Sequence, residues 1–257
     1  MSEVTKLIYK YLRHQKKFPH VWCPGCGIGI MLGSLIRAID QSGYEKDEIV
    51  LISGIGCSGR LPVYVDFNTL HTTHGRALTF ATGVKLAKPS LKVIVVMGDG
   101  DAVAIGGNHF IHAARRNIDV TAIIVNNSIY GMTGGQMAPT TLPGQKTTTS
   151  QHGRDVETQG YPIRASEMLA TLEGSSYIVR RSLHDPKNIR LAKKAIRMAF
   201  EVQIRGLGFS MVELLSTCPT NWGLTPQEAN QWLEEHMISY YPLNDFKVHP
   251  AIAQIRI

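Results

Sequence analysis

Two short polar turns hold the residues best suited to metal and phosphate chemistry. Residues 98–101 (Gly-Asp-Gly-Asp) follow one apolar run, and residues 126–129 (Asn-Asn-Ser-Ile) follow the next one along the chain. Glycine lets the backbone approach a phosphate, and a helix that begins after such a turn favours negative charge at its start. A carboxylate and an amide oxygen are hard ligands for an octahedral cation that also binds diphosphate oxygens. The turns therefore predict a magnesium–diphosphate site, although a lone Gly-Asp-Gly is also typical of a surface β-turn.

The spacing of these two turns resembles the fingerprint of thiamine diphosphate enzymes, because residues 101–125 separate Gly-Asp-Gly from Asn-Asn. In that family an Asp of the first turn, the second Asn and a main-chain carbonyl hold magnesium against the diphosphate. The resemblance implies that Asp99, Asn127 and the carbonyl of Ile129 are the magnesium ligands.

Four cysteines offer a second kind of chemistry. Cys23 and Cys26 form a C-x-x-C element, Cys57 follows the first predicted strand, and Cys218 follows the last. Structural disulfides are rare in the cytosol, so the thiols could be unrelated, form a redox dithiol, bind zinc as a set of four, or hold an iron–sulfur cluster. Cys57 and Cys218 can both reach the sheet edge that carries the diphosphate turns, where a cluster could carry electrons and zinc could not. This placement favours a cluster, while unrelated thiols, a redox dithiol and a zinc site stay open.

Short, β-branched, nearly continuous apolar runs must position these turns. They occupy residues 49–53, 92–97, 120–125, 176–181 and 210–215. No helical period can be read in them, so they predict buried parallel strands, and the helix-length segments between them imply βαβ crossovers. We therefore predict an α/β fold in which a doubly wound, mainly parallel sheet carries helices on both faces.

Two helices and one long loop complete the pattern. Residues 188–205 predict a packing helix with Ile189, Ala192, Ile196, Ala199 and Phe200 on one face. Thr225, Pro226 and Glu228 form a capping signature for a helix through Trp232. Residues 130–164 are rich in Gly and Pro, which indicates a functional loop, although the polar tract 147–157 within it could equally be a disordered insertion.

Length and composition suit one domain over residues 1–257, with an N-terminal C-x-x-C segment and a C-terminal extension. The 257 residues are 44% hydrophobic, which excludes a disordered chain, and carry a net charge of +7. The basic residues are scattered, which argues against nucleic-acid binding and suits either acidic partners or a solvated surface. No apolar run approaches the ~18 residues of a membrane helix, and residues 1–20 lack the features of a signal peptide. We expect a cytoplasmic protein that binds no membrane.

Over residues 22–243 the motifs resemble one family, the β subunits of 2-oxoacid:ferredoxin oxidoreductases. The segments that carry the resemblance are residues 22–27, 54–59, 71–77, 98–101, 106–117, 126–127, 130–136, 139–141 and 216–223. The resemblance implies that Cys23, Cys26, Cys57 and Cys218 bind a 4Fe–4S cluster. It also implies thiamine diphosphate contacts from Ile55, Gly56, Cys57, Ser58, His74, Gly100, Asp101, Gly131 and Met132.

Three further side chains near these motifs have less specific expectations. Arg76 can meet the diphosphate, the substrate carboxylate or a neighbouring acid. His109 and His112 are expected to serve packing or an interface.

The resemblance also implies a reaction. A 2-oxoacid is decarboxylated on thiamine diphosphate, coenzyme A takes the acyl group to give acyl-CoA and CO2, and electrons pass through the cluster to ferredoxin, as is typical of anaerobic metabolism. The glutamate that activates the cofactor comes from the partner α subunit in this family, so no catalytic residue is assigned to this chain. We expect a hetero-oligomer that is active only with that α subunit and that can include further small subunits.

The motifs around residues 130–133 and 219–226 look most like enzymes for 2-oxoglutarate. Met132 is flexible and apolar, which suits a bulky substrate better than pyruvate but cannot bind a second carboxylate. A branched-chain substrate such as 2-oxoisovalerate is the next candidate, ahead of pyruvate. Two more distant possibilities are a non-oxidative thiamine diphosphate decarboxylase subunit and a zinc-stabilised subunit without catalytic activity.

Overall fold

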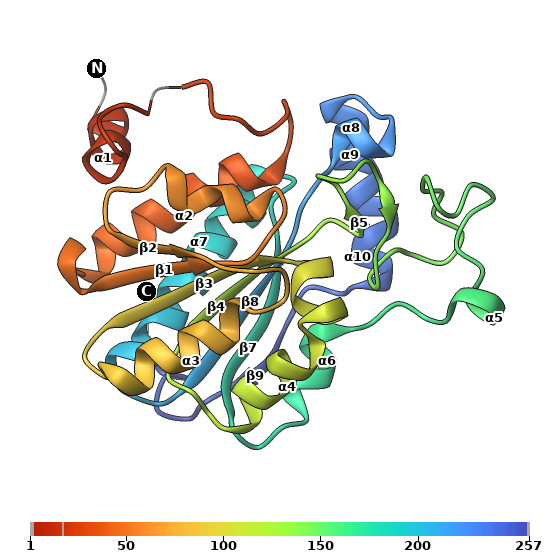
Figure 1. The fold of residues 1–257 in the computed structure, drawn as a ribbon. Coiled ribbons are helices and arrows are strands. Elements are labelled where there is room, and N and C mark those ends of the chain that lie inside the picture. Colours follow the sequence, from red (N-terminus) through yellow and green to blue (C-terminus); the bar gives the residue numbers. More distant parts are fainter. Residues whose placement is uncertain (1–2, 17, 256–257) are drawn as a thin grey trace.

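A seven-stranded sheet forms the centre of the fold, a computed structural model that describes residues 3–16 and 18–255 (Figure 1). The strand order is β2-β1-β3-β4-β8-β7-β9. Neighbouring strands run parallel, except that β9 is antiparallel to β7. The strands are β1 (Ile49–Ser53), β2 (Asn68–His71), β3 (Lys92–Gly98), β4 (Thr121–Asn126), β7 (Ser175–Ser182), β8 (Phe209–Leu215) and β9 (Asn244–Val248).

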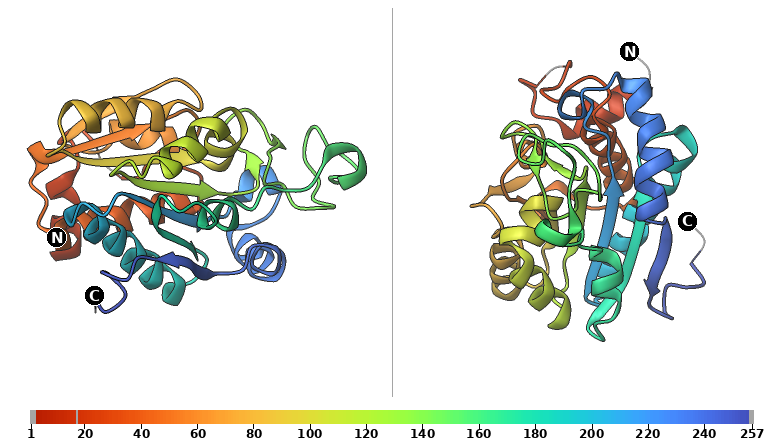
Figure 2. Two further views of the ribbon diagram at one scale, coloured as in Figure 1. Left: turned by 90° about the horizontal axis from the view of Figure 1, so that it is seen from below. Right: turned by 90° about the vertical axis from the view of Figure 1, so that its right-hand side faces the viewer.

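Helices cover both faces of the sheet, as the edge-on view in Figure 2 shows. On one face α2 (Gly27–Ser42) packs against α7 (Pro186–Ile204), and α1 (Glu3–Tyr11) contacts α2. The other face carries α3 (Ala77–Ala87), α4 (Gly107–Arg115) and α6 (Ala165–Ala170). No helix within the described part of the chain is long and apolar enough to span a membrane.

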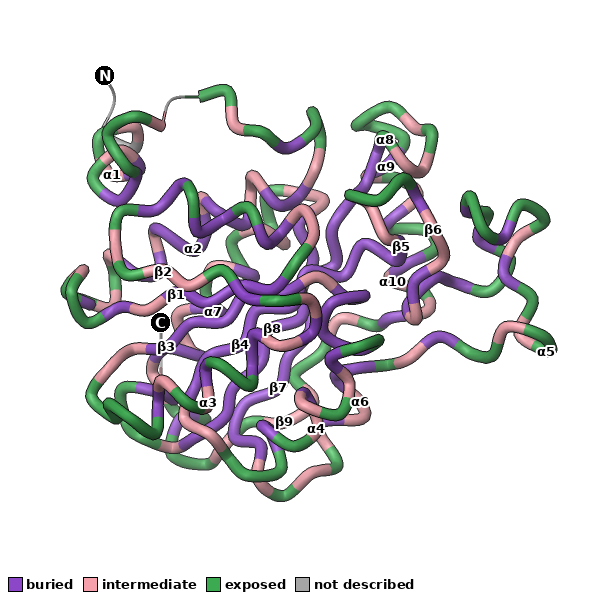
Figure 3. Tube along the Cα trace, in the orientation of Figure 1, coloured by how far each residue is buried: buried purple, intermediate pink, exposed green. Residues whose placement is uncertain are grey.

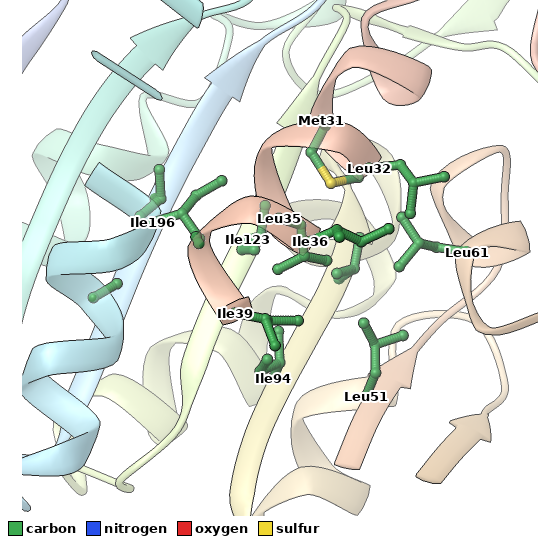
Figure 4. Packing of buried hydrophobic residues seen from close by; sticks show 14 of the residues in the cluster. Met31, Leu32, Leu35, Ile36, Ile39, Leu51, Leu61, Ile94, Ile123 and Ile196 are labelled. Carbon is green, nitrogen blue, oxygen red and sulfur yellow. The ribbon is translucent and has the colours of Figure 1, made fainter. Parts of the chain in front are cut away.

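The central strands β1, β3 and β4 are mostly apolar because both faces of the sheet are buried there. In β3, Ile94 and Val96 belong to the core beneath α2 and α7, whereas Val93, Val95 and Met97 belong to the core on the opposite face. Figure 3 shows the central strands as the most buried part of the chain. In Figure 4, side chains of α2 such as Met31 and Leu35 lie over strand residues that include Ile94 and Ile123.

The predicted doubly wound fold is confirmed. All five predicted strands are present, and β3 and β4 are neighbours, with Gly98 opposite Val125. The packing helix is α7, and α9 (Pro226–Trp232) begins with the expected capping box at Thr225. Two strands of this sheet were not predicted: β2 and β9 lie at its edges and are partly exposed, so they lack a continuous apolar run.

The remaining short elements gather at the end of the sheet where the parallel strands finish (Figure 1). They are β5 (Ile129–Tyr130), β6 (Gln136–Met137), α5 (Val156–Gln159), α8 (Pro219–Trp222) and α10 (Ile238–Tyr240). The stretch 130–164 is therefore folded: β5 and β6 form a hairpin, and α5 lies on an arm that extends away from the body.

Candidate functional site

The two polar turns lie side by side and line one cavity. β3 and β4 end next to each other, so the turns that follow them open onto the same edge of the sheet. A cavity of about 330 Å³ lies there. Its walls include the three residues predicted to hold magnesium, Asp99, Asn127 and Ile129, and all nine predicted cofactor contacts: Ile55, Gly56, Cys57, Ser58, His74, Gly100, Asp101, Gly131 and Met132.

Asp99 and Asn127 each offer a buried side-chain oxygen that can bind a cation. Asp99 is 3% exposed, and its Oδ2 accepts a hydrogen bond from the hydroxyl of Thr140. Burial raises the pKa of Asp99 to about 7, and the Thr140 hydrogen bond opposes that rise. The Oδ1 atom of Asn127 is buried and has no hydrogen-bond partner among the described residues. An oxygen-liganded cation bound between these two side chains would satisfy both groups.

Asp101 has a different role from Asp99, because it holds neighbouring turns together. Its Oδ1 accepts hydrogen bonds from the backbone amides of Gly75 (2.6 Å) and Ile55 (3.3 Å), and His74 Nδ1 lies 2.8 Å away. Burial raises the pKa of Asp101, and these amides and His74 oppose the rise. A side chain at Gly54 would collide with the Asp101 carboxylate, so this close approach requires glycine.

The four cysteines line a second cavity of about 490 Å³. They come from three places: the turn before α2, the turn after β1, and the segment between β8 and α8. The Trp22 indole donates a hydrogen bond to the Cys57 carbonyl (2.7 Å), and Asn221 Nδ2 donates to Cys218 Sγ (3.3 Å). The cysteines predicted to converge therefore do lie around one space.

Burial favours the protonated form of three of the four thiols. Burial, reinforced by the neighbouring cysteines, raises the pKa of Cys26 to about 12. Burial also raises the pKa of Cys57 and of Cys218. Across residues 3–16 and 18–255, no three His, Cys, Asp or Glu side chains are grouped as ligands of one metal ion. A 4Fe–4S cluster does not need that grouping, because each cysteine binds a different iron.

The two cavities share part of their walls. Five residues line both of them: Ile28, Cys57, Asn127, Gly131 and Met132. A group in the cysteine cavity would therefore be separated from a group in the first cavity by little more than these side chains.

Several residues at the site were not predicted from the sequence. Thr140 binds Asp99, the Tyr130 ring packs where a Gly100 side chain would be, and Asn221 joins Cys218 to the carbonyl of Gly131 (3.0 Å). Thr140 lies in a segment that carries the family resemblance, but its spacing from Asp99 gives no sign of contact. The elements that bring these residues together are loops, whose paths the hydrophobic pattern does not determine.

Arg76, His109 and His112, whose roles the sequence did not determine, line neither cavity. Arg76 Nη1 donates to the carbonyl of Ile105 (3.1 Å). His109 and His112 line a polar groove between α3 and α4.

Comparisons with known proteins give a consistent result. Residues 54–213 match the family model for thiamine pyrophosphate enzyme, C-terminal TPP binding domain. The chain is 54% identical over 226 residues to 2-oxoglutarate synthase subunit KorB of Archaeoglobus fulgidus, covering 88% of this chain and 79% of the relative. It is 43% identical over 202 residues to the 2-oxoacid:ferredoxin oxidoreductase subunit beta of Saccharolobus solfataricus, covering 77% and 62%.

A branched-chain relative and a solved structure are also similar. Ketoisovalerate oxidoreductase subunit VorA of Methanothermobacter thermautotrophicus is 42% identical over 230 residues, covering 90% of this chain and 48% of the relative. The solved structure is a 2-oxoglutarate:ferredoxin oxidoreductase from Magnetococcus marinus with 2-oxoglutarate, coenzyme A and succinyl-CoA bound. It is 37% identical with a TM-score of 0.74, covering 83% of this chain and 68% of that chain.

Proposed function

The chain belongs to the thiamine pyrophosphate enzymes and, within them, to the β subunits of 2-oxoacid:ferredoxin oxidoreductases, and from this premise we propose that it converts 2-oxoglutarate. The proposed reaction joins 2-oxoglutarate to coenzyme A and yields succinyl-CoA and CO2. The electrons released pass through a 4Fe–4S cluster to ferredoxin. An α subunit completes the active site, as the family resemblance implies.

The shared wall between the two cavities is the observation that carries this proposal. Cys57, Gly131 and Met132 line both the cavity suited to the cofactor and the cavity lined by the cysteines. Passing the released electrons to ferredoxin one at a time needs a one-electron acceptor next to the thiamine diphosphate, and a cluster in the second cavity would meet that need. A non-oxidative decarboxylase would not need four thiols behind that wall.

The residues around the first cavity suit magnesium and a diphosphate. Asp99, the side chain of Asn127 and the carbonyl of Ile129 would hold the metal, and the orphan Oδ1 of Asn127 supports this assignment. Ser58 Oγ is also buried without a partner among the described residues, so it can donate to a bound anion. Thiamine diphosphate, when bound, supplies the carbon nucleophile and the electron sink. The protein groups bind the diphosphate end and exclude water around it.

The cysteine cavity suits a cluster better than a zinc ion. Zinc has no redox chemistry, whereas a cluster in this cavity could accept electrons across the wall that the two cavities share. In the proposed site the four thiols lose their protons when they bind iron, because the thiolate is the ligand.

The similarity to 2-oxoglutarate enzymes favours 2-oxoglutarate as the substrate. The residues that line the first cavity can bind only part of this molecule, so we infer that the partner subunit binds the rest. Met132 is 42% exposed and apolar, so it can contact the carbon chain of the substrate. Among the described residues that line the first cavity there is no Lys or Arg for a second carboxylate. We therefore assign that cation to the α subunit.

Substrate preference in the complex with the α subunit tests the proposal. The complex would be produced anaerobically, and coenzyme A-dependent viologen reduction would be measured with 2-oxoglutarate, 2-oxoisovalerate and pyruvate. We expect kcat/KM for 2-oxoglutarate to exceed the values for 2-oxoisovalerate and pyruvate at least tenfold. A preference for 2-oxoisovalerate would instead support the branched-chain activity that VorA carries in its name.

Two analyses of the same sample test the cofactors independently of turnover. We expect iron and acid-labile sulfide in a cluster stoichiometry, together with broad visible absorbance that reductant bleaches. A complex that releases CO2 without iron would overturn the oxidative reaction in favour of the non-oxidative one. Bound zinc in place of both iron and thiamine would point to a subunit without catalytic activity.

A further inference from the structure

Glu213 is a buried carboxylate in β8, a strand whose other residues are mostly apolar and all buried. Its side chain is 1% exposed. Arg180 Nε (2.9 Å) and Ser166 Oγ (2.5 Å) donate hydrogen bonds to its Oε2, and Asn126 Nδ2 donates to its Oε1 (2.8 Å). The two oxygens therefore serve different elements: Oε2 binds β7 and α6, and Oε1 binds the end of β4.

Arg180 holds the Oε2 side in place. It is fully buried, and both terminal nitrogens donate to Glu167, at 3.0 and 2.5 Å. Its guanidinium also lies 5.1 Å from the ring centre of Tyr241 and 4.9 Å from that of Phe246. Apolar replacements of buried ion networks are often at least as stable as the network itself. Stability alone therefore does not explain why charged groups occupy this part of the core.

The Oε1 side leads to the diphosphate site through Asn126. A carboxylate only accepts hydrogen bonds, so Glu213 fixes the amide of Asn126 with its nitrogen toward β8. The amide oxygen then faces the next turn, where it accepts a hydrogen bond from the backbone N–H of Ser128 (3.1 Å). Ser128 has a φ of 54°, a left-handed conformation that is uncommon for a residue other than glycine.

Asn127 lies between these two anchored residues. Ser128 is also held from the other side, because its carbonyl accepts from the Thr141 hydroxyl (2.6 Å). The turn thus fixes the position of Asn127, which lines the cavity and whose buried Oδ1 has no partner among the described residues, and it leads directly into Ile129. We infer that Glu213, acting through Asn126, is a positioning residue for the turn that binds magnesium and diphosphate. This inference rests on the proposed function.

Replacing Glu213 by Gln tests the inference because it changes one acceptor into a donor with little change in shape. The Gln oxygen is expected to face Arg180 and Ser166, which leaves its NH2 group facing Asn126. Asn126 must then rotate its amide, and its own NH2 group meets the N–H of Ser128. Two donors cannot form a hydrogen bond, so the turn loses the contact that holds Ser128.

A second substitution can restore the pattern without restoring the original residues. In the double variant Glu213→Gln/Asn126→Asp, the aspartate accepts from the Gln NH2 group with one oxygen and from the Ser128 N–H with the other. It also keeps the number of carboxylates in the network unchanged. Recovery in the double variant would therefore show that hydrogen-bond direction at Asn126 sets the turn.

The readout is the dissociation constant of magnesium–thiamine diphosphate for the α–β complex stripped of cofactor, measured by titration calorimetry. We expect Glu213→Gln to raise this constant at least tenfold and the double variant to recover most of the loss. Wild-type affinity in Glu213→Gln, or equal weakening in both variants, would overturn the inference. If Glu213→Gln does not assemble, Asn126→Ser replaces it: weakened binding supports the inference and unchanged binding overturns it.

Asp119→Asn is the matched control, since it makes the same carboxylate-to-amide change at a partly buried ion pair. Asp119 lies just before the opposite end of β4 and pairs with Lys85 (2.9 Å), away from the site. The complex that carries Asp119→Asn is expected to bind the cofactor like the wild type and to keep the same iron content. Failure of the wild-type complex to bind thiamine diphosphate would refute the proposed function, whereas wild-type binding with unaffected variants would refute only the role of Glu213.

Discussion

Arg154 fastens the long segment 130–164 in its folded conformation, and this contact can be tested directly. The side chain is 6% exposed and donates hydrogen bonds only to backbone carbonyls among the described residues. Its closest acceptors are Thr141 (2.7 Å), Gly160 (2.9 Å) and Pro139 (3.1 Å). It thereby joins the two ends of the arm that carries α5, next to the residue that binds Asp99.

The size of the effect follows from these contacts. A hydrogen bond from a charged donor contributes roughly 1.5–3 kcal/mol. Arg154→Gln keeps at most one of the three short contacts, and carbonyls released near the surface regain water. We therefore expect the arm to open more easily by about 3 kcal/mol, and because each 1.4 kcal/mol is tenfold, the open population should rise roughly a hundredfold.

Limited proteolysis with thermolysin measures this opening, because cleavage follows the open population when opening is fast. The protease cuts before apolar residues such as Leu142 and Val156, so replacing a residue of the arm by Gln neither creates nor removes a cleavage site. Lys146→Gln, a change at an exposed position of the same arm, is the control and should be cut at the wild-type rate. A cleavage rate for Arg154→Gln within threefold of wild type would refute the assigned contribution of these hydrogen bonds.

Three further predictions concern the cluster, the metal and the fold. Cys218→Ser should remove most of the iron and visible absorbance while thiamine diphosphate affinity stays within about twofold; parallel loss of both cofactors would contradict separate sites. Thr140→Val deletes the hydroxyl bound to Asp99 and should weaken magnesium–thiamine diphosphate binding at least tenfold in calorimetry, in line with the roughly 1.5–3 kcal/mol of a hydrogen bond to a charged group; Thr140→Ser should retain it. Asp185 caps α7 by accepting from the Asn188 N–H (2.8 Å), so Asp185→Ala should cost about 1 kcal/mol in urea unfolding at pH 7. Burial would raise the pKa of Asp185, but the Asn188 hydrogen bonds lower it overall, so this stabilisation is present above pH 3.8 and is lost as the pH falls through the lower folded value. A difference between Asp185→Ala and the wild type that does not shrink as the pH is lowered below 3.8 would contradict the cap.

The part of the fold that could be predicted is the part buried on both faces. A central strand such as β3 is covered on both faces, so its buried residues, Val93 to Met97, are all apolar and form a recognisable run in the sequence. The edge strands β2 and β9 are only partly covered, and their sequences, Asn-Thr-Leu-His and Asn-Asp-Phe-Lys-Val, carry no such signal. Their pairing is determined by tertiary contacts.

The same distinction applies to the site. The diphosphate turns could be placed together because each directly follows a central strand, and parallel strands end at one edge. The contact from Thr140 to Asp99 joins residues 41 positions apart. It depends on the path of a loop that Arg154 and Tyr241 hold, and loop paths leave no periodic pattern in the sequence.

Glu213 shows how a local exception in a sequence can point to function. Every residue of β8 is buried, so an ionisable side chain there conflicts with the pattern that identifies the strand. Such conflicts are expected where a protein gives up local consistency for a site. The carboxylate orients Asn126, which precedes Asn127, so the exception in β8 and the polar turn after β4 belong to one hydrogen-bonded unit. A charged residue inside a predicted central strand is therefore a reason to look for the polar turn at the end of the neighbouring strand.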